Sequence, residues 1–290
     1  MTRAFSCLWI ILAAPLRLMP QQPPPVFRAE ARLVEVYATV LDHKGRFLDG
    51  LPRDRFRITD NGQPQSIVAF ENTTTPLFCA LLLDTTGSMH DSLPTVKNAM
   101  SRVIDEFRDD DSMAIYGFST SLDVLQDFTR DKAAAKRALL RNRAGGRTAL
   151  FDMLTNITMD IAGRSGKKAV LAFTDGDDNA SVLTAQRAVE SARKSGIPIY
   201  TVAQGEAHNS QALMKRLREI AKLTGGRSYG TNNPHQAAQI FRDISMELQH
   251  TYLIAYKPPA SHGGGWHQIK ISLSGANGYL VHAKEGYFQN

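Results

Sequence analysis

Residues 77–89 read LFCALLLDTTGSM, an uninterrupted apolar run that ends in a short polar stretch. A run that is apolar at every position is typical of a parallel strand whose two faces are both covered. Similar runs occur at 113–118 (MAIYGF), 169–173 (AVLAF) and 197–202 (IPIYTV). The region from about residue 77 to residue 249 therefore contains four expected parallel strands.

Amphipathic helices are expected between these strands. Apolar residues recur there at intervals of three and four, as on one face of a helix. They include Val96, Met100, Val103 and Phe107; Leu150, Leu154, Ile157 and Ile161; Leu213, Leu217 and Ile220; and Phe241, Ile244 and Leu248. Strands that alternate with helices predict an α/β fold, a doubly wound, mostly parallel sheet with helices on both faces.

A β-rich segment precedes this region, at residues 26–72. Apolar residues at every second position of 34–40 predict a half-buried strand. The dipeptide Asn61-Gly62 favours a hairpin between residues 56–58 and 67–69.

A second β-rich segment follows the region, at residues 251–290. Apolar residues alternate at 252–256 and 269–273, and residues 280–283 are expected to form a last strand. Neither flank is long enough to bury a good core alone. We therefore expect the two flanks to pack together as one small β domain beside the α/β domain.

The first 20 residues resemble a secretory signal peptide. Arg3 supplies a positive charge, and residues 5–14 form an apolar run that is too short to span a bilayer. The region around Ala13 is a poor cleavage site, so a mis-assigned start is the alternative. Residues 21–25 (QQPPP) are expected to be an extended spacer. We predict an exported protein, periplasmic or extracellular, without a transmembrane span in the mature chain.

The composition excludes several classes of protein. The chain has 290 residues, of which 43% are hydrophobic and 21% charged, as in ordinary globular proteins. Its 34 Lys and Arg residues are scattered, so the net charge of +6 marks no nucleic-acid site. The two cysteines, Cys7 and Cys79, cannot build a disulfide scaffold, and Cys79 is expected to be a buried apolar residue.

Polar residues follow the expected strands. In an open α/β sheet, ligands bind beyond the carboxyl ends of the strands. Asp84, Thr86 and Ser88 follow the first strand, Asp175 follows the third, and Thr148 precedes the second helix. We expect these five side chains to meet in exposed loops at one end of the sheet.

The five side chains offer oxygen atoms only, which suits a hard divalent cation; no set of Cys or His residues suggests zinc. Mg²⁺ is the expected ion, with Mn²⁺ or Ca²⁺ as alternatives. Because only two of the side chains are anionic, the ion stays electrophilic and can accept an acidic oxygen from outside. The pattern therefore predicts a divalent-cation site that can bind an acidic oxygen from outside the chain.

These motifs resemble the metal-ion-dependent adhesion site of von Willebrand factor A (VWA) domains. The stretch DTTGS at 84–88 is similar to the family's D-x-S-x-S loop, with Thr86 in place of the first serine. The stretches GGRT at 145–148 and TDG at 174–176 resemble its second and third loops. The resemblance covers about 77–249 and implies a Rossmann-like fold that acts in cell adhesion or other protein–protein interaction. It implies a metal-dependent binding module whose partner is a protein with an acidic side chain. The flanks resemble those of VWA-related proteins found especially in Acidobacteria.

Other interpretations exist for individual residues. Asp84 alone could cap a helix and Ser88 alone could sit in a turn, but the joint occurrence of three loops favours a metal site. Asp177 and Asp178 are expected to be loop or cap carboxylates, and residues 109–111 a solvated connection. Asp91 lies where a second metal site is possible, although a polar residue before a helix is the favoured interpretation.

Two other functions are less favoured than a binding module. A hydrolase is less favoured, because the extra threonine in DTTGS breaks the D-T-G-S spacing of aspartic proteases. The motifs of serine hydrolases and P-loop enzymes are absent, and Thr86 stands where a phosphatase using Asp84 would need a second acid. We therefore expect no enzyme activity. The main alternative is a structural subunit that organises the assembly of an envelope complex.

Overall fold

The computed structural model describes residues 33–141, 144–164, 166–175, 178–259, 265–275 and 278–289. The expected signal peptide at 1–20, the spacer at 21–25 and Asp177 lie outside these ranges. Within the described residues, none of the helices has the length and apolar composition that a membrane span requires.

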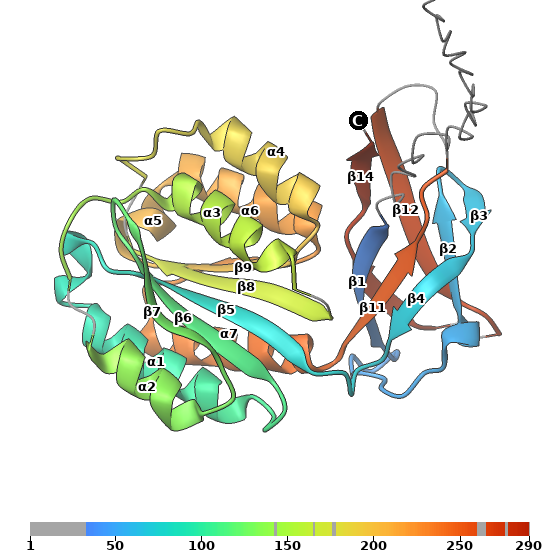
Figure 1. The fold of residues 1–290 in the computed structure, drawn as a ribbon, viewed down its shortest axis with the longest axis horizontal. Coiled ribbons are helices and arrows are strands. Elements are labelled where there is room, and N and C mark those ends of the chain that lie inside the picture. The colour runs from blue at the N-terminus through green and yellow to red at the C-terminus, as the bar shows by residue number, and fades with distance from the viewer. Residues whose placement is uncertain are drawn as a thin grey trace, which may run out of the picture. The chain divides into compact units, whose positions relative to one another are not determined.

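The central sheet has six strands in the order β10-β9-β8-β5-β6-β7 (Figure 1). The four expected strands are present as β5 (Leu77–Asp84), β6 (Ser112–Phe118), β8 (Lys167–Thr174) and β9 (Ile199–Ala203), all parallel. The edges are the parallel β10 (Ser228–Gly230) and the antiparallel β7 (Leu122–Thr129). Successive strands are added on one side of β5 and then on the other, so the strand order reverses between β5 and β8.

Helices cover both faces of this sheet (Figure 1). Apolar residues of α1 (Leu93–Glu106), α2 (Lys132–Arg141) and α7 (Pro234–Gln249) share one core with Leu81 and Leu83 of β5. Residues of α3 (Leu150–Ala162), α4 (Ala185–Ser195) and α6 (Gln211–Thr224) share the other with Ala80 and Leu82, and the short α5 (Gly205–Asn209) adjoins α6. The predicted doubly wound α/β fold is confirmed.

The two flanks form a pair of small antiparallel sheets. One has the order β13-β1-β11-β4: β13 (Leu280–Ala283), β1 (Val34–Leu41), β11 (Thr251–Tyr256) and β4 (Ile67–Glu71). The other has the order β14-β12-β2-β3: β14 (Gly286–Gln289), β12 (Gly265–Leu273), β2 (Phe56–Asp60) and β3 (Gln63–Gln65). Apolar residues of both sheets share one core, so they pack as a β-sandwich. Each sheet contains strands from both flanks, as expected.

Two details of the flanks differ from the sequence prediction. Asn61 and Gly62 do form a hairpin turn, with φ of 48° and 80°, but it joins β2 to β3, whereas residues 67–71 form β4 of the other sheet. The strand β1 is buried on both faces rather than half-buried. Its outer face packs against the α/β domain, where the Tyr37 hydroxyl accepts a hydrogen bond from Lys168 N (3.2 Å).

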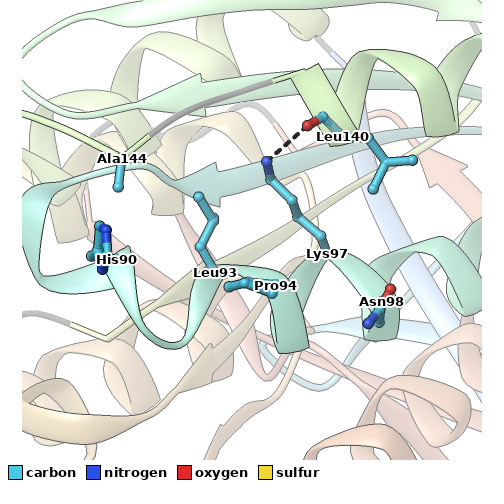
Figure 2. Close-up of a pocket in the computed structure, with 7 residues that line it drawn as sticks. All are labelled: His90, Leu93, Pro94, Lys97, Asn98, Leu140 and Ala144. Atoms are coloured by element: carbon cyan, nitrogen blue, oxygen red, sulfur yellow. Dashed lines mark hydrogen bonds between the residues drawn. The ribbon is translucent and has the colours of Figure 1, made fainter.

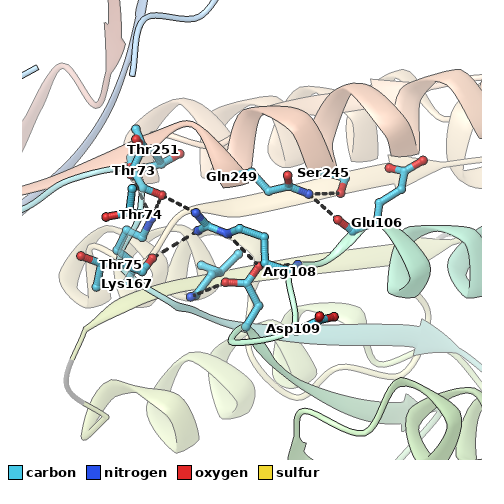
Figure 3. Close-up of polar contacts among 12 residues, drawn as sticks. Thr73, Thr74, Thr75, Glu106, Arg108, Asp109, Lys167, Ser245, Gln249 and Thr251 are labelled. Atoms are coloured by element: carbon cyan, nitrogen blue, oxygen red, sulfur yellow. Dashed lines mark hydrogen bonds and ion pairs between the residues drawn. The ribbon is translucent and has the colours of Figure 1, made fainter. Parts of the chain in front are cut away.

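Two cations, the buried Lys167 and the partly exposed Arg108, hold the segments that connect the flanks to the α/β domain (Figure 3). Lys167 Nζ donates to the carbonyl oxygens of Thr73 (3.3 Å) and Thr251 (3.2 Å). The Arg108 guanidinium donates to the carbonyl oxygens of Thr73 (2.7 Å) and Thr75 (3.3 Å). The entry into β5 and the exit from α7 are therefore tied to the same end of the sheet.

Asp111 belongs to this junction and corrects the expectation of a solvated connection. Its carboxylate is fully buried and accepts hydrogen bonds from Leu77 N (2.8 Å) and Arg108 N (3.0 Å). Asp109 and Asp110 remain exposed, as expected. Asp111 is buried because it satisfies the first N–H of β5 and lies beside the Arg108 guanidinium.

Candidate functional site

The carboxyl ends of two neighbouring strands bring two aspartates together. Asp84 is the last residue of β5, and Asp175 directly follows β8, its parallel neighbour. Asp84 is 0% exposed and Asp175 is 7% exposed. The burial of Asp84 differs from the expectation of fully exposed loops, because its carboxylate lies beneath the loop that follows it.

Hydroxyl groups connect the two carboxylates. Thr86 N and Thr86 Oγ1 donate to Asp84 Oδ1 at 2.9 and 2.7 Å. Thr86 Oγ1 lies 3.0 Å from Ser88 Oγ, which in turn donates to Asp175 Oδ1 at 2.8 Å. Four of the five expected ligands thus form one hydrogen-bonded network.

The electrostatics of the network are those of an uncompensated anionic site. Burial raises the pKa of the Asp84 carboxyl, while hydrogen bonds from Thr174 (2.6 Å) and Thr86 oppose the shift. Asp175 raises it further by repulsion. Within the described residues, neither carboxylate forms an ion pair with Lys, Arg or His. Burial therefore disfavours the ionised form of Asp84, and a bound cation would offset this cost.

Thr148 is connected to the network through backbone hydrogen bonds between loops. Its loop is bonded to the loop of Thr86 through Gly145 N to Thr85 O (2.7 Å) and Gly87 N to Gly146 O (3.2 Å). Thr148 is 2% exposed, and in the described part of the chain no donor or acceptor pairs with its hydroxyl. This hydroxyl remains available for a ligand.

Asp91 lies outside the network. Its side chain is fully exposed, and its Oδ1 lies within hydrogen-bond distance of His90 Nδ1 (2.9 Å). Asp178 is a cap carboxylate, as expected, because Phe151 N in the first turn of α3 donates to it (2.9 Å). The structure thus brings four of the five main candidates into one network, bonds the loop of Thr148 to the loop of Thr86, and leaves Asp91 and Asp178 aside.

Two further residues that were not among the expected ligands belong to the network. Ser92 Oγ donates to Asp175 Oδ2 (3.0 Å), and Thr174 Oγ1 donates to Asp84 Oδ2 (2.6 Å). Ser92 directly precedes α1, where a serine is expected as a helix cap. Thr174 is the last residue of a buried strand, where a threonine is common. Ser92 carries no signal that separates it from this ordinary role, whereas Thr174 lies in the TDG stretch that resembles the third loop.

The donor set fits a hard divalent cation. It consists of carboxylate and hydroxyl oxygens, which Mg²⁺ and Mn²⁺ accept as ligands. In the described ranges, no group of three or more His, Cys, Asp and Glu side chains is arranged so that it could hold a metal ion. The site therefore differs from an acidic cage or a zinc centre, and among the described residues two carboxylates, Asp84 and Asp175, supply its charge.

A pocket of about 530 Å³ lies beside the network (Figure 2). It is bordered by α1, the end of α2 and the turn η2 (Gly87–His90), which contains Ser88. Lys97 Nζ donates to the Leu140 carbonyl (3.1 Å), and His90 stands at the other end of the pocket. The described lining residues include no carboxylate; they are His90, Leu93, Pro94, Lys97, Asn98, Leu140 and Ala144.

Solved structures with a similar fold include a von Willebrand factor type A protein from Catenulispora acidiphila, with a TM-score of 0.52 and 15% identity over 90% of this chain and 75% of that one. A proximal thread matrix protein from the mussel byssus has a TM-score of 0.52 and 19% identity over 69% of this chain and 51% of that one. A variant of the PilB minor pilin from Streptococcus sanguinis has a TM-score of 0.50 and 15% identity over 61% and 62%. At these identities the similarity shows the fold alone.

Sequence comparison adds a relative and a family. An uncharacterized protein of Synechocystis sp. is 26% identical over 201 residues, which make up 64% of this chain and 46% of that protein. The chain thus spans about half the length of this curated relative. The sequence pattern of the von Willebrand factor type A domain matches residues 80–243, more than half of the chain. This chain therefore belongs to the von Willebrand factor type A domain family.

Proposed function

We propose that this chain is a Mg²⁺-dependent binding module that captures an acidic group of a protein partner. The observation that carries the proposal is the network of Asp84, Thr86, Ser88 and Asp175 at the carboxyl ends of β5 and β8. It combines two carboxylates with hydroxyl groups at the point where the strand order reverses, which is where open α/β sheets bind ligands.

The residues of the network have separate roles in this proposal. Asp84 and Asp175 supply the negative charge that holds the cation. The hydroxyls of Thr86, Ser88 and Thr148 supply neutral oxygen ligands and set the orientation, directly or through water. When bound, Mg²⁺ supplies an electrophilic position that accepts an acidic oxygen of the partner. Mn²⁺ and Ca²⁺ are alternative occupants of such an all-oxygen site.

The surroundings of the network support an acidic partner. Lys97 lines the neighbouring pocket as a cation, whereas His90, at the other end, is paired with the exposed carboxylate of Asp91. The apolar side chains Leu93, Pro94 and Leu140 offer contact area to residues that flank the acidic group. A partner segment that combines an acidic residue with apolar neighbours matches this surface.

The proposal also covers the organisation and location of the chain. We propose residues 77–249 as the binding domain and the flanks at 26–72 and 251–290 as the β domain that carries it.

The apolar run at residues 5–14 supports export, so the partner is sought in the periplasm or outside the cell. Cell fractionation tests this part: full-length protein found in the cytosol would contradict export.

Isothermal titration calorimetry with Mg²⁺ tests the metal site. Because Asp84 is buried, Asp84→Asn is preferred to Asp84→Ala: it keeps the shape of the side chain and an oxygen that accepts from Thr86. We expect Asp84→Asn to lower the Mg²⁺ affinity by more than the roughly 100-fold that loss of an outer-shell partner can cost. Asp91→Ala, which removes an exposed carboxylate nearby, serves as the matched control and should bind Mg²⁺ as the native chain does.

The outcome that contradicts the site is an Asp84→Asn protein that binds Mg²⁺ as tightly as the native chain. Recognition is then tested by capture from envelope extract with and without EDTA. Proteins that are released by EDTA, rebind with Mg²⁺ and fail to bind Asp84→Asn support the binding module. Association that survives EDTA favours the alternative of an assembly subunit, and turnover of a captured partner would favour a hydrolase.

A further inference from the structure

The three loops of the candidate site are bonded to one another in a closed ring. The first loop, residues 85–88, bonds the second, residues 144–149, through two backbone hydrogen bonds of 2.7 and 3.2 Å. The first bonds the third, residue 175 with residues 178–184, through Ser88 Oγ and Asp175 Oδ1 (2.8 Å). The remaining link of the ring joins the second loop to the third.

Asn179 makes this remaining link. Its side-chain Oδ1 accepts a hydrogen bond from Thr148 N (3.1 Å). Its backbone N and that of Ala180 both donate to the Thr148 carbonyl oxygen, at 3.0 and 2.9 Å. The peptide groups on both sides of the Thr148 side chain are therefore fixed by the loop that also carries Asp175.

This arrangement sets the direction of the Thr148 hydroxyl. The Thr148 side chain is β-branched, so its χ1 is restricted once its backbone is fixed. The hydroxyl has no partner among the described residues that could orient it instead. A neutral ligand contributes to a metal site only when its oxygen is held at the coordination distance, and partners behind the ligand provide that restraint.

We infer that Asn179 is a positioning residue: through Thr148 N it holds the Thr148 hydroxyl toward the cation, an inference that rests on the proposed function. Asn179 itself does not touch the ion in this arrangement. It couples the position of one ligand, Thr148, to the loop of another, Asp175, so that the two approach the ion as a unit.

The rest of the third loop is anchored independently of the Asn179 side chain. Asp178 Oδ2 accepts from Phe151 N (2.9 Å), and Ser181 Oγ accepts from Asp152 N (3.1 Å). The Asp152 carboxylate accepts from Val182 N and Leu183 N, both at 2.8 Å. Removal of the Asn179 side chain should therefore release Thr148 N without detaching the loop from α3.

The test compares Asn179→Ala, Asn179→Asp and a double mutant in the full chain, by calorimetry with Mg²⁺. We expect Asn179→Ala to lower the Mg²⁺ affinity about 10-fold, at the lower end of what such partners cost, because the two backbone bonds to Thr148 O remain. Asn179→Asp keeps an acceptor for Thr148 N and should restore the affinity. In a Thr148→Ala background, Asn179→Ala should change the affinity less than about 2-fold, because the ligand through which Asn179 acts is gone.

Ser181→Ala is the matched control, since it removes a side chain of the same loop that bonds α3 rather than Thr148. It should leave the Mg²⁺ affinity unchanged. Equal affinity of Asn179→Ala and the native chain overturns the inference but leaves the proposed function standing. Fully additive effects of Asn179→Ala and Thr148→Ala would also overturn the inference and leave the proposed function standing. Additivity would indicate a general loosening of the loop.

Hydrogen exchange provides a readout that does not depend on the metal. In Asn179→Ala without Mg²⁺, the amide of Thr148 should lose protection, while the amides of Val182 and Leu183 keep theirs. Unchanged protection of the Thr148 amide would overturn the inference even if no Mg²⁺ binds to the native chain. In that last case the proposed function fails separately, by its own calorimetric test.

Discussion

Asp109, Asp110 and Asp111 are adjacent in sequence but lie in different environments. The carboxylate of Asp111 is buried between the start of β5 and Arg108, whereas the other two are exposed. Nothing in a run of three identical residues distinguishes the one that accepts a buried N–H. That distinction arises only when β5 is placed beside the turn that contains the run.

Substitution of the buried and of the exposed aspartate should change the free energy of unfolding by different amounts. Asp111→Asn turns an NH₂ group toward Leu77 N–H or Arg108 N–H and leaves Arg108 without its carboxylate, so we expect a loss of about 2–3 kcal/mol in the free energy of unfolding. Asp109→Asn breaks only an exposed pair with Lys132 (3.3 Å) and should change it by less than about 1 kcal/mol. Urea denaturation measures both, and equal effects would contradict the assignment.

The clustering of the candidate ligands could be predicted because their side chains lie in short stretches of sequence next to strand ends. Asp84, Thr86 and Ser88 occur together in one stretch, and Asp175 follows an obvious strand. The contribution of Asn179 could not be predicted, because its side chain meets Thr148 only after β8 and α3 are packed against each other. Spacing along the chain predicts neighbours within a loop, but partners across loops depend on the fold.

Among the elements, the buried strands were the easiest to predict and the small or polar ones the hardest. The helix α4 was missed because its buried residues are Ala188, Val189 and Ala192, which give a weak apolar pattern. Its ends do carry signals: Thr184 accepts from Arg187 N at the start, and Gly196 ends it with φ of 65°. The edge strand β7 is half-exposed along its length, so its sequence lacks the apolar run of a central strand.

Gly226 allows the chain after α6 to pass directly over β9. A Cβ at this position would lie 2.6 Å from the carbonyl carbon of Ile199, a backbone atom that cannot move without displacing β9. We expect Gly226→Ala to lower the free energy of unfolding by about 3 kcal/mol or more. Gly163→Ala is the matched control, because Gly163 has φ of −73° and no atom within 4 Å of the added Cβ. Denaturant melts that show similar losses for both variants would refute this packing argument.

Lys167 makes the free energy of unfolding of the whole chain increase with pH. Burial lowers the pKa of Lys167 from 10.5 to about 8, with the Arg108 charge as a further cause, while Asp111 and Glu71 oppose the shift. Between these two values the unfolded chain binds more protons than the folded chain, so the free energy of unfolding rises with pH. Below about pH 8 both states hold the proton, and the full cost of burying the ammonium is present.

The variant Lys167→Met isolates this effect. We expect the native chain to gain up to about 3 kcal/mol relative to Lys167→Met as the pH rises from 8 toward 10. Buried tyrosines such as Tyr116 act in the opposite direction at higher pH, because burial raises their pKa above 10.0, but they are common to both proteins. Urea melts at several pH values give the difference, and parallel curves for the two proteins would contradict the lowered pKa.

The pairing of β4 with β11 has a consequence for how the chain folds. Glu71 faces Leu253 across this pair, so the whole α/β domain is an insertion into the connection between two adjacent strands. In an unfolded chain, the loss of conformational entropy makes closing so long a connection about 3 kcal/mol less favourable in free energy than closing a short turn. Once the inserted domain has folded, its two ends lie side by side, and the connection behaves as a short loop. Strands from the two ends of the chain can then pair as rapidly as neighbours, which makes the inserted domain the natural starting point for assembly of the sandwich.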